Sequence, residues 1–483
     1  MTTRYRRTTI AVAIAGLASA LGTGHAFGAA FALAEQNVMG LGNAFAGSGA
    51  TAEDANTVWY NPAGLARLNF TQFETAVHLI KPSAKFQNAN SQAATGQPLG
   101  GTGGDAGDLA AVPNLYASMA INPEWHVGIG INAPFGLKTE YDNGWLGRYQ
   151  ALKSEVKTIN VNPAVGFRAT KDLWFGAGAN YQRIQATLTN AVNYTGALAQ
   201  GYQQLAAAGQ IPASAIPSLV GATAGLDSKA EITGDDAAWG WNVGAMYSIN
   251  GDANNDNGAA RIGFAYRSKI KYNVVGSVTF TNPTPPTLTG ALAPFNAAVT
   301  GVSNSINQTR LTNGGVALSL EMPDMASLSY YQRLNDQWDV LADVTWTGWS
   351  SIPELRIVRT SGSVLSVLPE NFKDTWRFSA GVNYSPTEKV VLRAGVAFDQ
   401  TPVNNTDRGP RLPDGDRTWL SVGGRFKLSP STNIDVGAAY VWVRDPSINT
   451  SGNPPSVAGN GLINGQYNNN VTIVSAQVNY RFR

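Results

Sequence analysis

Charged side chains are scarce in this chain of 483 residues. Only 14% of the residues are Asp, Glu, Lys or Arg, against about 25% in soluble domains. The mean hydropathy of −0.13 shows that the chain is nevertheless not apolar overall. A soluble protein with so little charge would need an unusually large core, whereas a transmembrane β-barrel turns one face of each strand to lipid and the other to a polar lumen. The composition therefore favours a barrel.

Cysteine is absent, which excludes disulfides, thiolate metal sites and cysteine nucleophiles together. The three histidines, His25, His78 and His126, lie far apart in sequence and make a poor case for zinc. The run from Asp252 to Gly258 begins like a calcium loop, but its glycine comes one place late and no glutamate closes it. The net charge of +2 comes without a basic stripe. We therefore expect no metal, no cofactor and no nucleic-acid partner.

Long apolar runs are also missing, apart from one near the start. Arg4, Arg6 and Arg7 form a basic region that precedes the apolar run Ile10–Leu21, and small residues follow. This layout is typical of a secretory leader, because the run is shorter than the ~20 residues that a spanning helix needs. We expect a signal peptide over residues 1–28, cleaved after Ala26 or Gly28. No later stretch is apolar enough to span as a helix, so membrane residence must come from strands.

Alternation of apolar and polar residues runs through the second half of the chain. In Thr375–Tyr384, every second residue from Trp376 onward is apolar, while Arg377 lies on the polar face. Similar patterns occur in 390–399, 420–428, 434–442 and 474–482. A soluble sandwich also alternates, but here charges recur on the polar face and are missing from the apolar face. A water-filled lumen permits charges on the polar face. On the apolar face, a Lys or Arg in contact with lipid would cost ~2–4 kcal/mol.

The connections between strands alternate in length. Short turns are expected at 122–124, 169–172, 335–337, 385–388 and 429–432, and long Gly-, Pro-, Ser- and Asn-rich segments between them. The longest of these are 188–235 and 281–318. Short turns at one end and long loops at the other are typical of outer-membrane barrels. We predict an all-β fold, a transmembrane antiparallel barrel of about fourteen strands over residues 70–483.

The loop 188–235 has an unusual composition. Ala197–Gly209 favours a helix, and Ile211–Leu226 carries spaced Ile, Leu and Val, which is odd for a loop in water. This loop is either a packed external loop or a surface that binds hydrophobic ligands from water.

Residues 29–69 do not alternate. They are small and polar with scattered apolar side chains such as Leu33 and Phe45, which favour burial. About forty residues are too few for a separate domain, so we expect either a periplasmic tail or a plug, here called the hatch, in the lumen. Gly40-x-Gly42 is not a nucleotide loop, because no strand precedes it and no Lys-Ser/Thr follows.

Several motifs in this order resemble the FadL family of outer-membrane transporters for long-chain fatty acids and aromatic hydrocarbons. They are GLGNAFAG at Gly40–Gly47, WYNPAGLARL at Trp59–Leu68, APFGLKTEYDNGWLGRY at Ala133–Tyr149, KDTWRFSAGVNY at Lys373–Tyr384 and RLPDGDRTWLSVGG at Arg411–Gly424. Each motif is weak alone, and their order and spacing together are specific. The resemblance implies a fourteen-stranded barrel with an N-terminal hatch and sideways release of ligand through a gap in the wall. Arg483 departs from the usual aromatic terminus.

The resemblance also implies site residues. Asn61, Pro62 and Ala63 match the hatch motif of the family, and Phe31 matches an aromatic residue beside the bound ligand. The lateral opening is expected at Pro134, Phe135 and Gly136, where Pro lacks a backbone donor and Gly permits a kink. Without the family, Asn61-Pro62 would be read as an ordinary turn.

The function expected is passive uptake of hydrophobic molecules, most of all long-chain fatty acids, across the outer membrane of a Gram-negative bacterium. A carboxylate ligand needs a basic residue, and lumen-facing Arg377 and Arg393 are candidates. An aromatic hydrocarbon channel of the same family and a general porin are the alternatives; a hydrolase built on a Ser–His pair is formally open but not favoured. The expected partners are the hydrophobic small molecule and outer-membrane lipid and lipopolysaccharide, and we expect a monomer.

Overall fold

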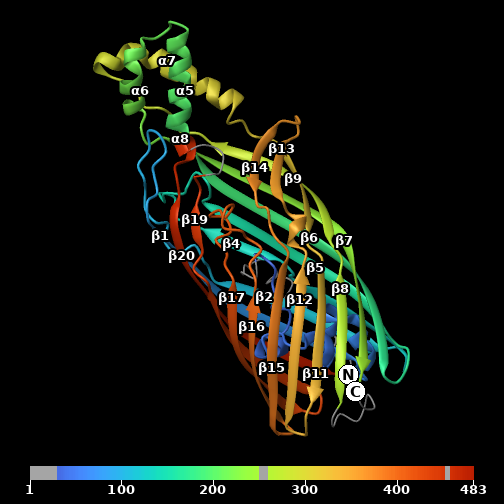
Figure 1. The fold of residues 1–483 in the computed structure, drawn as a ribbon. Helices are drawn as coiled ribbons and strands as arrows, with labels where there is room; N and C mark the ends of the chain where they lie inside the picture. Colours follow the sequence, from blue (N-terminus) through green and yellow to red (C-terminus); the bar gives the residue numbers. More distant parts are fainter. Residues whose placement is uncertain (1–29, 250–258, 452–456, 483) are drawn as a thin grey trace, which may run out of the picture.

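The computed structural model describes residues 30–249, 259–451 and 457–482. The predicted signal peptide and the turn at Asp252–Gly258 lie outside these residues. The chain forms one closed antiparallel sheet, because β1 pairs with β2 on one side and with β20 on the other (Figure 1). Within the described residues, none of the helices has both the length and the hydropathy to cross a membrane. The strands are β1 (Gln72–Asn88), β2 (Ala110–Ala120), β3 (Trp125–Asn132), β4 (Gly136–Glu140), β5 (Lys153–Arg168), β6 (Leu173–Asn193), β7 (Asp227–Ser248), β8 (Ala260–Arg267), β9 (Ile270–Thr281), β10 (Gly314–Met322), β11 (Met325–Arg333), β12 (Trp338–Thr347), β13 (Glu354–Arg359), β14 (Val364–Pro369), β15 (Thr375–Thr387), β16 (Val390–Asp399), β17 (Arg417–Ser429), β18 (Thr432–Val443), β19 (Ser447–Asn449) and β20 (Asn464–Arg481).

The twenty strand segments join into fourteen barrel strands. Six barrel strands are interrupted once, and in each of them both pieces pair with the same neighbouring barrel strand on at least one side. These pairs of pieces are β3 with β4, β8 with β9, β10 with β11, β12 with β13, β14 with β15, and β18 with β19. The predicted fold class is thus confirmed.

Alternation along the strands separates a lipid face from a lumen face. In β15, Trp376 and Phe378 are each 46% exposed on the outside, while Ser379 and Asn383 are buried on the inside. Aromatic side chains gather near both ends of the apolar band, with the rings of Trp338 and Tyr384 4.5 Å apart at one end. Trp376 and Tyr384 are about 20 Å apart along the barrel axis, given ~3.3 Å per residue and a tilt of ~40°. The spacing lies within the apolar band of about 25 Å that outer-membrane barrels present to lipid.

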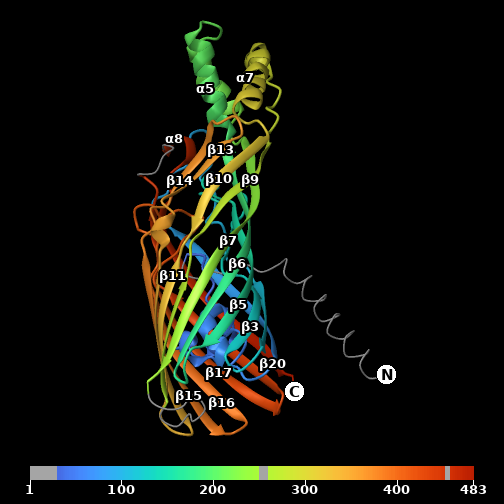
Figure 2. The ribbon, with the colours of Figure 1, turned by 90° about the vertical axis from the view of Figure 1, so that its right-hand side faces the viewer.

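The connections are short at one end of the barrel and long at the other, as expected. The turn between β17 and β18 has two residues, Pro430 and Ser431, which connect Ser429 to Thr432. At the opposite end, α5 (Tyr194–Ala207), η3 (Ala213–Ala215) and α6 (Ile216–Ala222) connect β6 to β7, and η4 (Gly290–Phe295) and α7 (Asn296–Thr309) connect β9 to β10. These helices project beyond the barrel (Figures 1 and 2). Two further short helices are η5 (Trp349–Ser351), between β12 and β13, and α8 (Val457–Asn460), between β19 and β20.

The loop helices share an apolar cluster of their own. Leu198 and Tyr202 of α5 pack with Leu219 of α6 and with Val299 and Ile306 of α7, and all are buried. The apolar residues noted in the sequence therefore contact one another in a helical unit above the barrel. The connection from β6 to β7 is shorter than the expected range 188–235, since the paired strands continue to Asn193 and resume at Asp227.

Residues 30–69 form the hatch, which lies inside the lumen toward the end with the short turns (Figure 2, blue). Its helices are α2 (Val38–Gly42), α3 (Ser48–Thr51), α4 (Thr57–Tyr60) and η2 (Pro62–Arg67). Its first residues, 30–36, are here called the arm; they precede these helices and bond to the barrel wall. Almost every hatch residue is buried.

Glycines of the wall make room for the hatch backbone, and we call five of them the glycine belt. A Cβ on any belt glycine would overlap or press on hatch atoms: Gly166 on Ala66, Gly176 on Pro62, Gly244 on Asn61, Gly263 on Gly49 and Gly395 on Asn43. Glycine in a strand is favoured where another backbone approaches closely. Since these glycines lie on β5, β6, β7, β8 and β16, the hatch is seated against opposite sides of the barrel.

Candidate ligand-binding site

The barrel wall is interrupted between β3 and β4. Asn132 pairs with Asn160 and Gly136 pairs with Lys157, so four steps along this strand oppose three steps along β5. One extra residue is therefore accommodated, as in a β-bulge. On the other side, β2 pairs with β3 only through Leu115–Ala120, and β4 has no pairing with β2 among the described strands. Residues 110–114 of β2 thus face a gap in the ladder.

The arm supplies hydrogen bonds at this break. The amide of Leu33 donates to the carbonyl of Pro134 at 2.8 Å, and the amide of Gly136 donates to the carbonyl of Phe31 at 2.8 Å. Ala32 and Phe135 thereby form an antiparallel bridge. The Thr158 hydroxyl of β5 donates to the carbonyl of Phe135 at 2.7 Å and accepts from its amide at 2.9 Å. Backbone groups that a wall neighbour would satisfy in a regular barrel are here satisfied by the arm and by Thr158.

Phe31 fills an apolar pocket above the hatch. Its ring lies 4.8 Å from that of Trp349 and 6.0 Å from that of Phe135, measured between centroids, and the ring of Phe372 lies 6.0 Å from that of Trp349. Phe31 is 9% exposed. Burial of a phenylalanine side chain contributes roughly 1.5–3 kcal/mol. The predicted residues Phe31, Pro134, Phe135 and Gly136 are thus brought together at one place.

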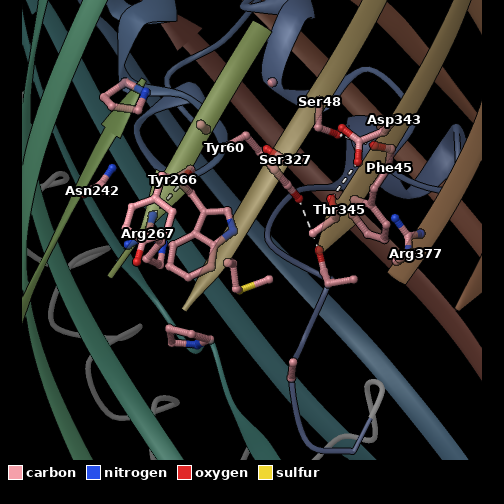
Figure 3. A pocket seen from close by; sticks show the side chains of 18 of the residues that line it. Phe45, Ser48, Tyr60, Asn242, Tyr266, Arg267, Ser327, Asp343, Thr345 and Arg377 are labelled. Carbon is pink, nitrogen blue, oxygen red and sulfur yellow. Dashed lines mark hydrogen bonds between the residues drawn. The ribbon is translucent and has the colours of Figure 1, made fainter. Parts of the chain in front are cut away.

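A cavity of about 120 Å³ lies between the hatch, the arm and the wall (Figure 3). Ala32, Leu33, Pro62 and Pro134 line it together with residues of β7, β8, β11, β12 and β15. Arg267 and Arg377 lie on opposite sides of it. Ligand pockets usually measure about 300–1,000 Å³. The cavity therefore has to grow before it can hold a long ligand. The parts of its lining that do not belong to the strands are the arm and the rest of the hatch.

Asn61, Pro62 and Ala63 fasten the hatch to the wall. The Asn61 side chain accepts from the amide of Ala63 at 3.1 Å and donates to the carbonyls of Gly49 and Ala245 at 2.8 and 3.0 Å. It caps η2, with Pro62 as the first residue of that helix. Asn61 thus joins two hatch helices to β7, and of the three residues only Pro62 reaches the cavity.

Ion pairs hold the hatch at the end nearer the short turns. Asp54 contacts Arg425, which also binds Asp435 at 2.8 Å, and Asn479 of β20 donates to Asp54 at 3.3 Å. Asn56 donates to both oxygens of Glu74 of β1 at 2.9 Å. Burial raises the pKa of Asp54 above its ordinary value, against the opposite pull of Arg425. The hatch therefore contacts the first and the last strand at once.

The two arginines proposed from sequence have different surroundings. Arg393 binds Asp435 at 3.0 Å and Glu53 at 3.7 Å beside the hatch, so its charge is neutralised away from the cavity. Arg377 lines the cavity and donates to the carbonyl of Ala44 at 2.7 Å. A third arginine, Arg267, also lines the cavity and was not singled out from sequence, although its place in the alternation of β8 marks it as lumen-facing.

Glu35 of the arm is fully buried, and neither carboxyl oxygen has a hydrogen-bond partner. Burial raises the pKa of Glu35 to about 7, while Arg417 and Arg377 act in the opposite direction. The arm thus carries a carboxyl group that is easily protonated.

Comparison with known proteins shows which proteins this chain is similar to. A family model described as outer membrane protein transport protein (OMPP1/FadL/TodX) matches residues 19–482. The long-chain fatty acid transport protein of Shigella flexneri is 29% identical over 450 residues, which cover 92% of this chain and 94% of that protein. Outer membrane protein P1 of Haemophilus influenzae is 29% identical over 479 residues, covering 96% of this chain and 97% of that protein.

Solved structures of similar proteins have the same fold as this chain. A FadL homologue of Pseudomonas aeruginosa is 25% identical, with a TM-score of 0.79, and the match covers 94% of this chain and 100% of that one. The toluene transporter TodX of Pseudomonas putida shares the fold at 18% identity and a TM-score of 0.61, over 89% of this chain and 94% of that one. The resemblance drawn from the sequence motifs is confirmed: this chain belongs to the OMPP1/FadL/TodX family and is an outer-membrane β-barrel transporter of hydrophobic compounds.

Proposed function

We propose that the protein takes up long-chain fatty acids by passive binding and releases them sideways through the gap beside β4. The observation that carries this proposal is the pairing of the arm with the break at Pro134–Gly136, next to the apolar pocket that Phe31 fills. A ligand that enters the pocket competes with Phe31 for the same apolar surface. The full-length similarity to a long-chain fatty acid transport protein supports this cargo.

In the proposed path, the ligand first meets the apolar loop helices and then descends toward the pocket. Its entry displaces Phe31, and the arm withdraws from the break. Two backbone hydrogen bonds between arm and wall are then lost, and the gap becomes accessible from the cavity. Differential affinity of the ligand for the withdrawn state supplies the free energy for this change.

The moving part is the arm rather than the whole hatch. The glycine belt and the ion pair of Asp54 with Arg425 hold the rest of the hatch against the wall. In this proposal Asn61, Pro62 and Ala63 keep the floor of the cavity fixed, so that ligand cannot pass straight through. A permanently open pore for hydrophilic solutes would need the hatch to be displaced, which disfavours the general porin.

An aromatic hydrocarbon channel is the second candidate. The pocket around Phe31 is rich in rings, with Phe135, Trp349 and Phe372 close to one another. Such a pocket accommodates a flat ring as well as an alkyl chain. Uptake of labelled oleate and of labelled toluene by cells that lack their own transporters separates the two candidates, and uptake of toluene without oleate would overturn the fatty-acid proposal.

The lateral route is tested by removing the extra residue. Deletion of Ala133 restores equal steps between the pairs Asn132–Asn160 and Gly136–Lys157, so the strand becomes regular and the gap closes. We expect the barrel to fold and oleate uptake to fall at least tenfold. Deletion of Gly209, in the turn after α5 and with no atom near its would-be Cβ, is the matched control. Normal uptake by a folded Ala133 deletion would contradict the lateral route.

A further inference from the structure

Arg267, the last residue of β8, presents its guanidinium to the cavity above the hatch (Figure 3). It donates to the side-chain oxygen of Asn180, to the carbonyl of Trp59 at 2.9 Å and to the side-chain oxygen of Asn162 at 3.4 Å. Its charged carbon lies 3.6 Å from the centroid of the Trp59 ring. All these partners are uncharged. Among the residues that the structure describes, no carboxylate forms an ion pair with Arg267 within 4.0 Å.

Three other inward-facing arginines of the barrel, Arg393, Arg417 and Arg425, have carboxylate partners. Arg425 binds Asp435 at 2.8 Å, and Arg417 binds Asp414 at 2.6 Å. A charge removed from water is costly unless it is paired, because the interior solvates it poorly. The immediate contacts of Arg267 are thus two side-chain amides, a backbone carbonyl and an indole ring, so its charge is not compensated on its own side of the cavity and can attract an anion.

Arg377, on the opposite side of the same cavity, also forms no ion pair within 4.0 Å among the described residues, but it has carboxylates close by. It lies directly across the ladder from Asp399 of β16, and Asp343 also lines the cavity. Asp343 is held by the hydroxyls of Ser329 and Thr345, which keeps its charge near that wall. A ligand carboxylate would meet repulsion on the side of Arg377 and attraction on the side of Arg267.

A row of side-chain amides connects Arg267 to the arm. Asn180 accepts from Arg267 and from Asn160, Asn160 also donates to Asn132 at 3.0 Å, and Asn132 donates to Gln36 of the arm at 2.8 Å. Gln36 in turn donates to the carbonyl of Ala133 at 3.0 Å, within the strand break. This row fixes the position of the guanidinium relative to the gap.

We propose that Arg267 binds the carboxylate head group of the ligand while the apolar tail occupies the pocket of Phe31. This inference rests on the proposed uptake of hydrophobic compounds and narrows the ligands to amphipathic monocarboxylates. Guanidinium and carboxylate form paired charge-assisted hydrogen bonds, which the uncharged acceptors around Arg267 do not match. Selection of an acid over an equally apolar uncharged molecule then follows from this one residue.

The test compares oleate with oleyl alcohol, which has the same tail and no charge. Dissociation constants are measured by tryptophan fluorescence with the purified full chain in detergent. We expect wild type to prefer oleate by roughly 10- to 100-fold, the range of a hydrogen bond to a charged group. Arg267→Gln should remove that preference by weakening oleate alone, and Arg267→Lys should retain part of it.

Arg377→Gln is the matched control, because Arg377 also donates to a hatch carbonyl and lies over hatch Phe45, 5.5 Å from its ring. We expect it to weaken both ligands by the same factor. Heat-modifiable migration in gels checks that each variant is folded. Equal weakening of acid and alcohol by Arg267→Gln, or an unchanged preference for oleate, would overturn the head-group site. Binding of neither oleate nor oleyl alcohol by wild type would instead remove the proposed function itself.

Discussion

Gly395 of β16 lies against the backbone of Asn43, so closely that a Cβ on Gly395 would overlap the carbonyl carbon of Asn43. The hatch and the wall meet here with no side chain between them. Substitution of a belt glycine therefore tests how firmly the hatch is seated.

We expect Gly395→Ala to destabilise the protein by about 1–3 kcal/mol, the usual cost of overpacking. The thermal unfolding midpoint in detergent measures this, and single-channel recordings should show brief openings that wild type lacks. Gly314→Ala serves as the control, since its Cβ would meet only the side chain of Arg359 at 3.5 Å. Equal midpoints for the two variants would show that the hatch adapts.

Phe31 holds the arm in its pocket through apolar contact. Phe31→Ala should loosen the arm by about 3 kcal/mol, the lower end for a buried phenylalanine. Because the chain has no cysteine, Ala32→Cys provides a unique label site beside Phe135. We expect labelling of Cys at position 32 by a water-soluble maleimide to accelerate about 100-fold when Phe31 is replaced. An unchanged labelling rate would show that the two arm hydrogen bonds suffice.

Glu35 makes the docking of the arm depend on pH. Its pKa is raised by burial from 4.5 to about 7, so the folded state binds the proton more tightly than the unfolded state. Stability is then greatest at low pH and falls as pH rises from about 4.5 to about 7, by about 3 kcal/mol in total. Unfolding midpoints at pH 5 and pH 8 measure the fall, and Glu35→Gln should make it smaller. A fall of the same size in both proteins would assign it to other groups.

The loop helices are expected to collect dilute ligand. Deletion of Ala197–Leu226 leaves Tyr194, Thr195 and Gly196 to connect the paired residues Asn193 and Asp227. Oleate uptake should then fall severalfold at nanomolar concentration and remain near normal at high concentration, because the inner pocket is untouched. Unchanged uptake at low concentration would leave the helices without a role in capture.

The alternation of residues was sufficient to predict the barrel, because a strand with lipid on one side and a polar lumen on the other can place Trp376 and Arg377 in only one way. The lengths of β6 and β7 were not predictable. They have 21 and 22 residues, beyond the roughly 9–11 that a membrane needs. Outside the bilayer both faces of a strand meet water. The alternation of apolar and polar residues therefore weakens there, although the backbone pairing of β6 and β7 continues.

The candidate site was only partly predictable. Motif similarity indicated Phe31 and the break at Pro134–Gly136, but their hydrogen bonds join residues about one hundred positions apart and appear only in the fold. Arg267 was missed for a similar reason. Its significance depends on which neighbours lack charge, and those neighbours come from β5, β6 and the hatch. A local sequence pattern cannot show that an arginine lacks a charged partner in the folded protein.

The contacts of Asp54 and Asn56 have a consequence for biogenesis. Asp54 contacts Asn479 of the final strand, and Asn56 contacts Glu74 of the first, so the two edges that must meet share a template that is synthesised before either. A nascent sheet that curls around this template closes with the hatch already inside it. For a sheet that closes in this way, joining of the first and last strands and enclosure of the hatch are one step.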